Sequence, residues 1–134
     1  MKDISQYLTP AYYSALASVG LPIYDGMAPD TEKGSYIIIG EIQSSQDQDK
    51  AGYMFTVNIL IDICIKNGSF GFADADNYAN IITGIISSDS QPSLSPNFQI
   101  VRTHLLSSNR LTGLNKTEPI FRRLLRYEHS IVQI

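Results

Sequence analysis

The chain has 134 residues, a length that fits one domain and leaves little room for a second. Its hydrophobic fraction of 43% and charged fraction of 17% are those of a globular rather than a disordered protein. The single cysteine, Cys64, excludes an intrachain disulfide and a cysteine-based zinc site. No apolar stretch approaches the ~18 residues of a membrane span, and the first residues lack the apolar run of a secretory signal. We therefore expect one domain, over residues 1–134, suited to a reducing cytoplasm.

The net charge of −3 is unevenly distributed along the chain. Residues 1–101 carry eleven acidic and four basic side chains, a balance of −7, whereas residues 102–134 carry six basic and two acidic ones, a balance of +4. Such asymmetry suggests an electrostatic partner, for which a second copy of the chain would serve. The alternative is that these charges, on strands, simply face solvent.

The first predicted element is a helix over residues 10–19. Thr9 supplies an N-cap and Pro10 the first helical residue. Gly20, followed by Pro22, gives the stop signal.

Extended segments follow this helix. Residues 22–26 form a short extended piece that ends in a turn, and residues 27–35 read as a loop. Residues 36–42 are rich in β-branched side chains and predict a strand. The most polar segment, residues 44–52, predicts a hairpin with an extended tip.

The clearest periodic signal is a strand over residues 53–66. One face carries the apolar set Tyr53, Phe55, Val57, Ile59, Ile61, Ile63 and Ile65. The other carries Met54, Thr56, Asn58, Leu60, Asp62, Cys64 and Lys66. Alternation with a period of two predicts an antiparallel strand with one buried face and one more polar face.

A second helix is predicted over residues 73–87 and a loop over 88–97. The apolar stripe of this helix is Tyr78, Ile81, Ile82, Ile85 and Ile86. Strands over residues 98–106 and 119–133 close the chain, joined by a loop that includes 109–115. The order α-β-β-β-α-β-β predicts an α+β fold, with two helices packed on one face of an antiparallel or mixed sheet.

Two loops imitate ligand-binding motifs without completing them. Residues 47–52 begin like a calcium loop, but Ala51 and Asn58 stand where an oxygen ligand and a glutamate are needed. Residues 68–71 lie between a strand and a helix but lack the lysine and spacing of a phosphate loop. Aspartates in the first turn of the following helix would also repel a phosphate.

Catalytic motifs are equally incomplete. His104 and His129 fall on separate predicted strands, where they could be neighbours, but no hydrolase or metalloprotease motif surrounds them. Cys64, inside a strand, is expected to be a small hydrophobic residue rather than a nucleophile. We therefore expect no enzyme, no metal and no cofactor.

A nucleic-acid interface is the remaining alternative from chemistry. Arg122, Arg123 and Arg126 interleave with Phe121 and Tyr127, as basic and aromatic groups do on strand platforms. The sequence pI of about 5.2 opposes duplex binding. A small ligand- or nucleic-acid-binding module thus stays open, although sequence-specific binding is not expected.

Several segments together resemble the tail-completion (tail terminator) family of long-tailed bacteriophages. They are the stretch 21–29, Leu-Pro-Ile-Tyr-Asp-Gly-Met-Ala-Pro, and the strand 36–41, Tyr-Ile-Ile-Ile-Gly-Glu. The long strand, the helix with Ala79-Asn80-Ile81-Ile82 and the last strand with Leu124-Leu125-Arg126-Tyr127 correspond in order and length. Ser35 departs from the proline that the family often has before the tyrosine.

This resemblance implies a virion protein of the tail or neck, made in the host cytoplasm. Members form a ring, commonly of six copies, that caps the tail tube, ends its growth and joins it to the head-side connector. The expected partners are therefore further copies of the chain, the tail-tube protein and the connector, with no membrane. Another neck protein or a tail-tube subunit is the alternative.

The candidate contact residues fall into two groups. For tube or connector contact they are the hairpin tip, Gln46, Asp47, Gln48, Asp49 and Lys50. For subunit pairing they are Arg122, Arg123 and Arg126.

Overall fold

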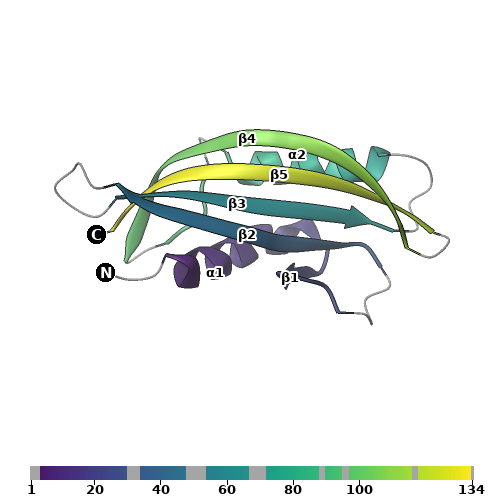
Figure 1. Ribbon diagram of the computed structural model, residues 1–134, viewed down its shortest axis with the longest axis horizontal. Coiled ribbons are helices and arrows are strands. Elements are labelled where there is room, and N and C mark those ends of the chain that lie inside the picture. The colour runs from purple at the N-terminus through teal and green to yellow at the C-terminus, as the bar shows by residue number, and fades with distance from the viewer. Residues whose placement is uncertain are drawn as a thin grey trace.

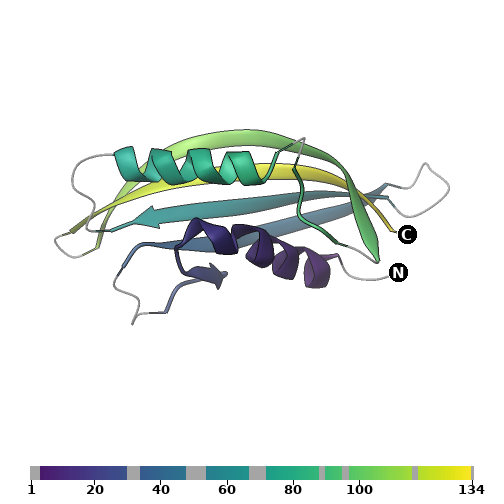
Figure 2. The same cartoon turned by 180° about the vertical axis from the view of Figure 1, so that it is seen from behind.

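The computed structural model describes residues 4–29, 34–47, 54–66, 72–87, 90–94, 97–115 and 118–133. Its elements are α1 (Ser5–Leu16), a 3-10 turn (Ala17–Val19), β1 (Ile23–Asp25), β2 (Tyr36–Asp47), β3 (Met54–Ile65), α2 (Ala73–Ile85), β4 (Phe98–Asn115) and β5 (Glu118–Gln133). Five strands form one sheet in the order β1-β2-β3-β5-β4. Figure 2 shows both helices in front of this sheet, and Figure 1 shows the sheet from its other side. The predicted α+β class and element order are confirmed.

The sheet is mixed, because β1 runs parallel to β2 while the remaining pairs are antiparallel. The three residues of β1 follow the end of the first helical segment, where Gly20 adopts φ 94° and turns the chain back to the sheet edge. Such a positive φ favours glycine, so the predicted stop signal has its expected physical cause.

The core lies between the helices and the sheet. The apolar face of β3 is buried from Phe55 to Ile65, as its alternation predicts, and packs with Leu125 and Tyr127 of β5. The opposite face of β3 is only partly buried until Asp62 and Cys64, which are buried too. Burial therefore extends to both faces of the strand at its C-terminal end.

Helix α1 begins at Ser5, so the predicted start at residue 10 is wrong. The buried side chains Ile4, Leu8, Tyr12 and Leu16 recur every four residues and extend the apolar stripe one turn and more before Pro10. Pro10 therefore lies inside the helix, where it removes one backbone hydrogen bond near the N-terminal end. Burial of the stripe outweighs that local signal.

Helix α2 ends at Ile85, two residues before the predicted end. Its buried residues are Ala75, Ala79 and Ile82, whereas Ile81, which the predicted stripe includes, is exposed. Small alanines let the helix approach the sheet closely. The predicted stripe counted only large side chains, and it therefore lies too far toward the solvent-exposed side of the helix.

Two strands are longer than predicted. β2 continues to Asp47, and β4 continues through residues 107–115, where a loop was expected. This part of β4 pairs residue by residue with the start of β5, from Ser107 opposite Arg126 to Asn115 opposite Glu118. Its polar residues and Gly113 carry little strand propensity, so the pairing depends on the partner strand. Within the described part of the chain, no helix is long and apolar enough to cross a membrane.

Candidate functional site

The face of the sheet that the helices leave uncovered, here called the open face, gathers most of the polar side chains of β3 and β5. The pairing of β3 with β5 places Arg122 opposite Cys64, Leu124 opposite Asp62, Arg126 opposite Leu60 and Glu128 opposite Asn58. All of these side chains point away from the helices, because their sequence neighbours form the core on the other face. The open face is thus a mixed surface of aliphatic and charged groups.

This surface includes an ion pair between Arg122 and Asp62, near the C-terminal end of β3. The guanidinium donates from Nε to Oδ1 at 3.2 Å and from Nη2 to Oδ2, which is a bidentate arrangement. Asp62 is only 6% exposed. The hydrogen bond to Asp62 raises the pKa of Arg122 above its ordinary value, against the opposing effect of burial. The guanidinium of Arg122 therefore stays protonated.

Cys64 lies beside this pair and is held as a neutral thiol. Its Sγ donates to Oδ1 of Asp62 at 3.5 Å. Burial, followed by the nearby Asp62 carboxylate, raises the pKa of Cys64 to about 12. A thiol with such a pKa is a poor nucleophile, in agreement with the expectation that this residue packs rather than reacts.

A second ion pair crosses the open face. Arg126 of β5 and Glu41 of β2 approach to 3.7 Å across the intervening strand β3. Both side chains are substantially exposed, so the pair contributes little to stability.

Arg123 points to the opposite, helix-bearing side of the sheet. It donates to Asp76 of α2 at 2.5 Å and also to Ser108 of β4, while Arg110 of β4 donates to the same aspartate at 2.6 Å. Burial acts to raise the pKa of Asp76, but hydrogen bonds from Arg123 and Arg110 lower it overall. The first turn of α2 is thereby fastened to β4 and β5.

The three arginines predicted for subunit pairing are therefore not brought together. Arg122 and Arg126 lie on the open face and Arg123 lies on the other, and each faces an acidic group of its own chain. Their role in subunit pairing stays a prediction.

Of the predicted hairpin tip, Gln46 and Asp47 form the end of β2. Gln48, Asp49 and Lys50 lie outside the described residues. The predicted tube or connector contact of this tip therefore also stays a prediction.

The two histidines lie on opposite faces of the sheet. His104 is exposed on β4, whereas His129 of β5 is fully buried beneath α1. The Tyr12 hydroxyl contacts Nε2 of His129, and Thr103 Oγ1 lies 3.0 Å from Nδ1. Burial lowers the pKa of His129 to about 4, against the opposing effect of a backbone hydrogen bond at Arg102. This buried network joins α1 to the two last strands.

This network was not predicted from the sequence. Tyr12 and His129 are 117 positions apart, and neither interrupts the periodicity of its element in a way that indicates a partner. Burial also raises the pKa of Tyr12 well above its ordinary value, so both rings are neutral. The network serves as a packed, uncharged contact between the helix and the sheet.

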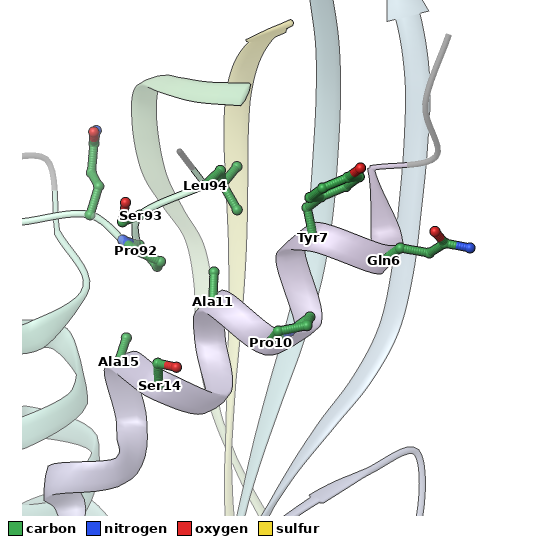
Figure 3. Close-up of a pocket in the computed structure, with 10 residues that line it drawn as sticks. Gln6, Tyr7, Pro10, Ala11, Ser14, Ala15, Pro92, Ser93 and Leu94 are labelled. Carbon is green, nitrogen blue, oxygen red and sulfur yellow. The ribbon is translucent and has the colours of Figure 1, made fainter. Parts of the chain in front are cut away.

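An open cleft of about 600 Å³ lies between α1 and residues 91–94 (Figure 3). Its lining consists of Gln6, Tyr7, Pro10, Ala11, Ser14, Ala15, Gln91, Pro92, Ser93 and Leu94. Among the described residues, the lining carries no carboxylate, imidazole or cationic side chain that could act as a general acid or base near neutral pH. Over the described ranges of the chain as a whole, no three His, Cys, Asp or Glu side chains gather as a metal site would require.

Comparison with known proteins finds likeness in structure alone. No protein-family model matches the sequence, and no curated protein matches it. The structure is similar to a chain from the virion of a native gene transfer agent particle, with a TM-score of 0.65 and 21% identity over 98% of this chain and 92% of that one. It is also similar to a solved structure without a functional name, with a TM-score of 0.57 and 12% identity over 93% and 94% of the two chains. At these identities the likeness shows a shared fold that spans the chain from end to end.

Proposed function

We propose that this chain is a structural, non-catalytic protein of a phage-type virion, acting as a tail terminator. In this role copies of the chain form a ring, of six subunits, that caps the tail tube, ends its growth and joins the tail to the head-side connector. The protein assembles in the host cytoplasm and remains in the tail or neck of the particle.

The observation that carries the proposal is the end-to-end likeness to a chain of a gene transfer agent virion. Each chain covers more than nine-tenths of the other, so this fold is not one module of a larger enzyme in that particle. The sequence features that resemble the tail-completion family lie chiefly in residues 21–29 and in strand β2.

The chemistry of the described residues supports an assembly role. Charged groups on both faces of the sheet are arranged in ion pairs within the chain, with Asp62, Asp76 and Glu41 as the acidic partners. The described residues that line the cleft beside α1 are uncharged. A protein that works by contact needs a stable surface rather than a reactive centre.

The test is native mass spectrometry over a concentration series, combined with electron microscopy of tail tubes mixed with the protein. The proposal expects a discrete closed oligomer near six times 14.9 kDa, bound at one end of each tube. Binding only along tube walls, or no binding to tubes and no ring, would contradict it.

A tail-tube subunit is the second candidate, because both edges of the sheet carry strand length without a described partner. The same microscopy separates the two. A tube subunit polymerises into tubes of open-ended length, whereas a terminator stops at one ring.

A further inference from the structure

One edge of the sheet is long and carries exposed apolar side chains. β4 is the outermost strand, 18 residues long, and among the described strands it pairs only with β5. Of the seven large apolar side chains that are exposed among the described residues, four lie on β4: Val101 (50%), Leu105 (37%), Leu106 (43%) and Leu111 (45%). Monomeric proteins usually protect a strand edge with charge or proline, and exposed apolar groups on such an edge indicate an interaction surface.

The opposite edge is half covered. β1 pairs with β2 only at Ile37, Ile38 and Ile39. From Gly40 to Asp47, β2 has no strand on its outer side within the described part of the chain. Its exposed side chains there are polar, and they are Glu41, Gln43, Ser44 and Ser45.

The two edge strands have opposite directions, and their residues align with one another across the sheet. β2 and β4 run in opposite directions, because three antiparallel pairings separate them. Following the pairs across the sheet, Gln43 aligns with Asn58, then Glu128, then His104. In the same way Ser45 aligns with Thr56, then Ser130, then Arg102. A copy rotated about an axis along the strands therefore brings its β2 antiparallel to this β4 at the same level.

Bulges mark where such pairing ends. β2 is irregular between Gly40 and Ile42, and β4 between Leu105 and Ser107. Ile42 and Leu105 are at the same height, since Ile42 aligns with Ile59, then Tyr127, then Leu105. Bulges bend a strand away from its neighbours. Both edge strands therefore bend close to the point where the pairing of β1 with β2 ends, at Ile39.

The charges of the two edge strands favour pairing of β4 with β2 over pairing of β4 with a second β4. Arg110 and Glu41 are paired within their own chain, with Asp76 and Arg126. The remaining charged residue of β4 is Arg102, and that of β2 is Asp47. A two-fold dimer that paired β4 with β4 would oppose like charges, whereas β4 against β2 opposes unlike ones. A contact between two different edges is heterologous and repeats from copy to copy until it closes.

We infer that copies of this chain join edge to edge, with Phe98–Leu105 of β4 in one subunit pairing antiparallel with Ile42–Asp47 of β2 in the next. The contact continues one sheet from subunit to subunit, with the open faces side by side. It rests on the ring proposed above and names the surface that closes it.

The test is disulfide trapping in a Cys64→Ser background, which removes the only native cysteine. Two double variants place cysteines at the aligned positions: Ser45→Cys with Arg102→Cys, and Gln43→Cys with His104→Cys. Both positions of each pair lie on the open face, and directly opposed residues of antiparallel strands have Cβ atoms about 5 Å apart. Exchanging the partners, Gln43 with Arg102 and Ser45 with His104, covers a shift of two residues either way.

The expected result under mild oxidation is a ladder of covalent oligomers that ends at ring size, at least tenfold stronger than in the control. The matched control places cysteines at Tyr13 and Ile81, two exposed positions on the helices. Each single-cysteine variant stops at a dimer, because a longer ladder needs both edges of one subunit. Circular dichroism and native mass spectrometry establish that every variant folds and report its assembly.

The outcomes separate this inference from the proposed function. Rings that persist while all four cysteine pairs crosslink no better than the control overturn edge pairing and leave the ring standing. In that case β4 is free to meet a different protein, such as the tube. A protein that forms no ring alone or on tubes, and gives no ladder, overturns both.

Discussion

The two faces of strand β3 are buried by different means. On the helix side Ile59, Ile61 and Ile63 are completely buried by apolar packing against the helices and β5. On the open face Asp62 and Cys64 reach nearly the same burial beneath no helix at all, covered instead by Arg122 and its neighbours. The first kind of burial stabilises the subunit through the hydrophobic effect, whereas the second keeps a surface polar enough to remain in water before assembly.

The largest expected effect comes from the helix side. Ile61→Ala leaves a cavity in the core and should lower the free energy of unfolding by about 2–5 kcal/mol. Leu60→Ala, the adjacent residue on the half-buried open face, should cost about 1 kcal/mol. Urea unfolding followed by circular dichroism measures both, and equal costs would contradict the comparison.

Acid should weaken the helix side through His129. Its folded-state pKa of about 4 lies below the ordinary value of 6.5, so the unfolded state binds more protons between these values. The contribution of the neutral His129 ring to the free energy of unfolding is therefore fully present above pH 6.5. It is lost as the pH falls toward 4, by about 3 kcal/mol in total. Unfolding in urea at a series of pH values measures this slope.

A matched pair of variants tests whether His129 causes this pH dependence of the free energy of unfolding. His129→Gln should flatten the dependence between pH 6.5 and 4 even though it lowers stability overall, because the titrating ring is gone. His104→Gln, at an exposed position of β4, is the matched histidine control. A slope that survives in His129→Gln would show that other groups titrate there.

The ion pair between Arg122 and Asp62 on the open face should contribute an intermediate amount to stability. Asp62→Asn removes one charge and leaves the Arg122 guanidinium partly buried beside a neutral amide, at a cost of about 1–3 kcal/mol. Asp62→Asn combined with Arg122→Gln should recover part of this loss, since no unpaired charge remains. Thermal unfolding of both variants at one pH tests this, and a double variant less stable than the single would contradict it.

The smallest effect is expected at the outer ion pair. Arg126→Gln breaks a contact between two exposed side chains 3.7 Å apart and should change stability by less than about 0.5 kcal/mol. Glu41→Gln should behave alike. If either variant prevents assembly while its stability is unchanged, the side chain acts in the contact between subunits rather than in the fold.

Prediction from sequence succeeded where one periodic signal dominated. The alternation of β3 placed its buried face correctly: the alternate residues from Phe55 to Ile65 are all buried, and Tyr53 lies outside the described residues. It failed where a local signal competed with packing, as at Pro10, which marks a helix start in isolation but lies inside α1. The length of β4 was missed because the pairing of residues 107–115 depends on a strand that follows them in the chain.

The candidate site was harder to predict, because it depends on contacts between distant residues. The sequence identified Arg122, Arg123 and Arg126 as a basic group but not their division between the two faces, which follows from the register of β5 against β3. The acids they meet, Asp62 and Asp76, lie 60 and 47 positions away from Arg122 and Arg123. No local pattern carries that information.

Cys64 makes the open face observable in the native protein. With a pKa of about 12, its thiol is ionised in on the order of one molecule in ten thousand at pH 8, and it is buried as well. A thiol reagent should therefore modify it only when β3 and β5 separate locally, so the rate of modification reports the free energy of that opening. Because Cys64 is the only cysteine, one mass shift follows this event without a label, in the free subunit and in any assembly it enters.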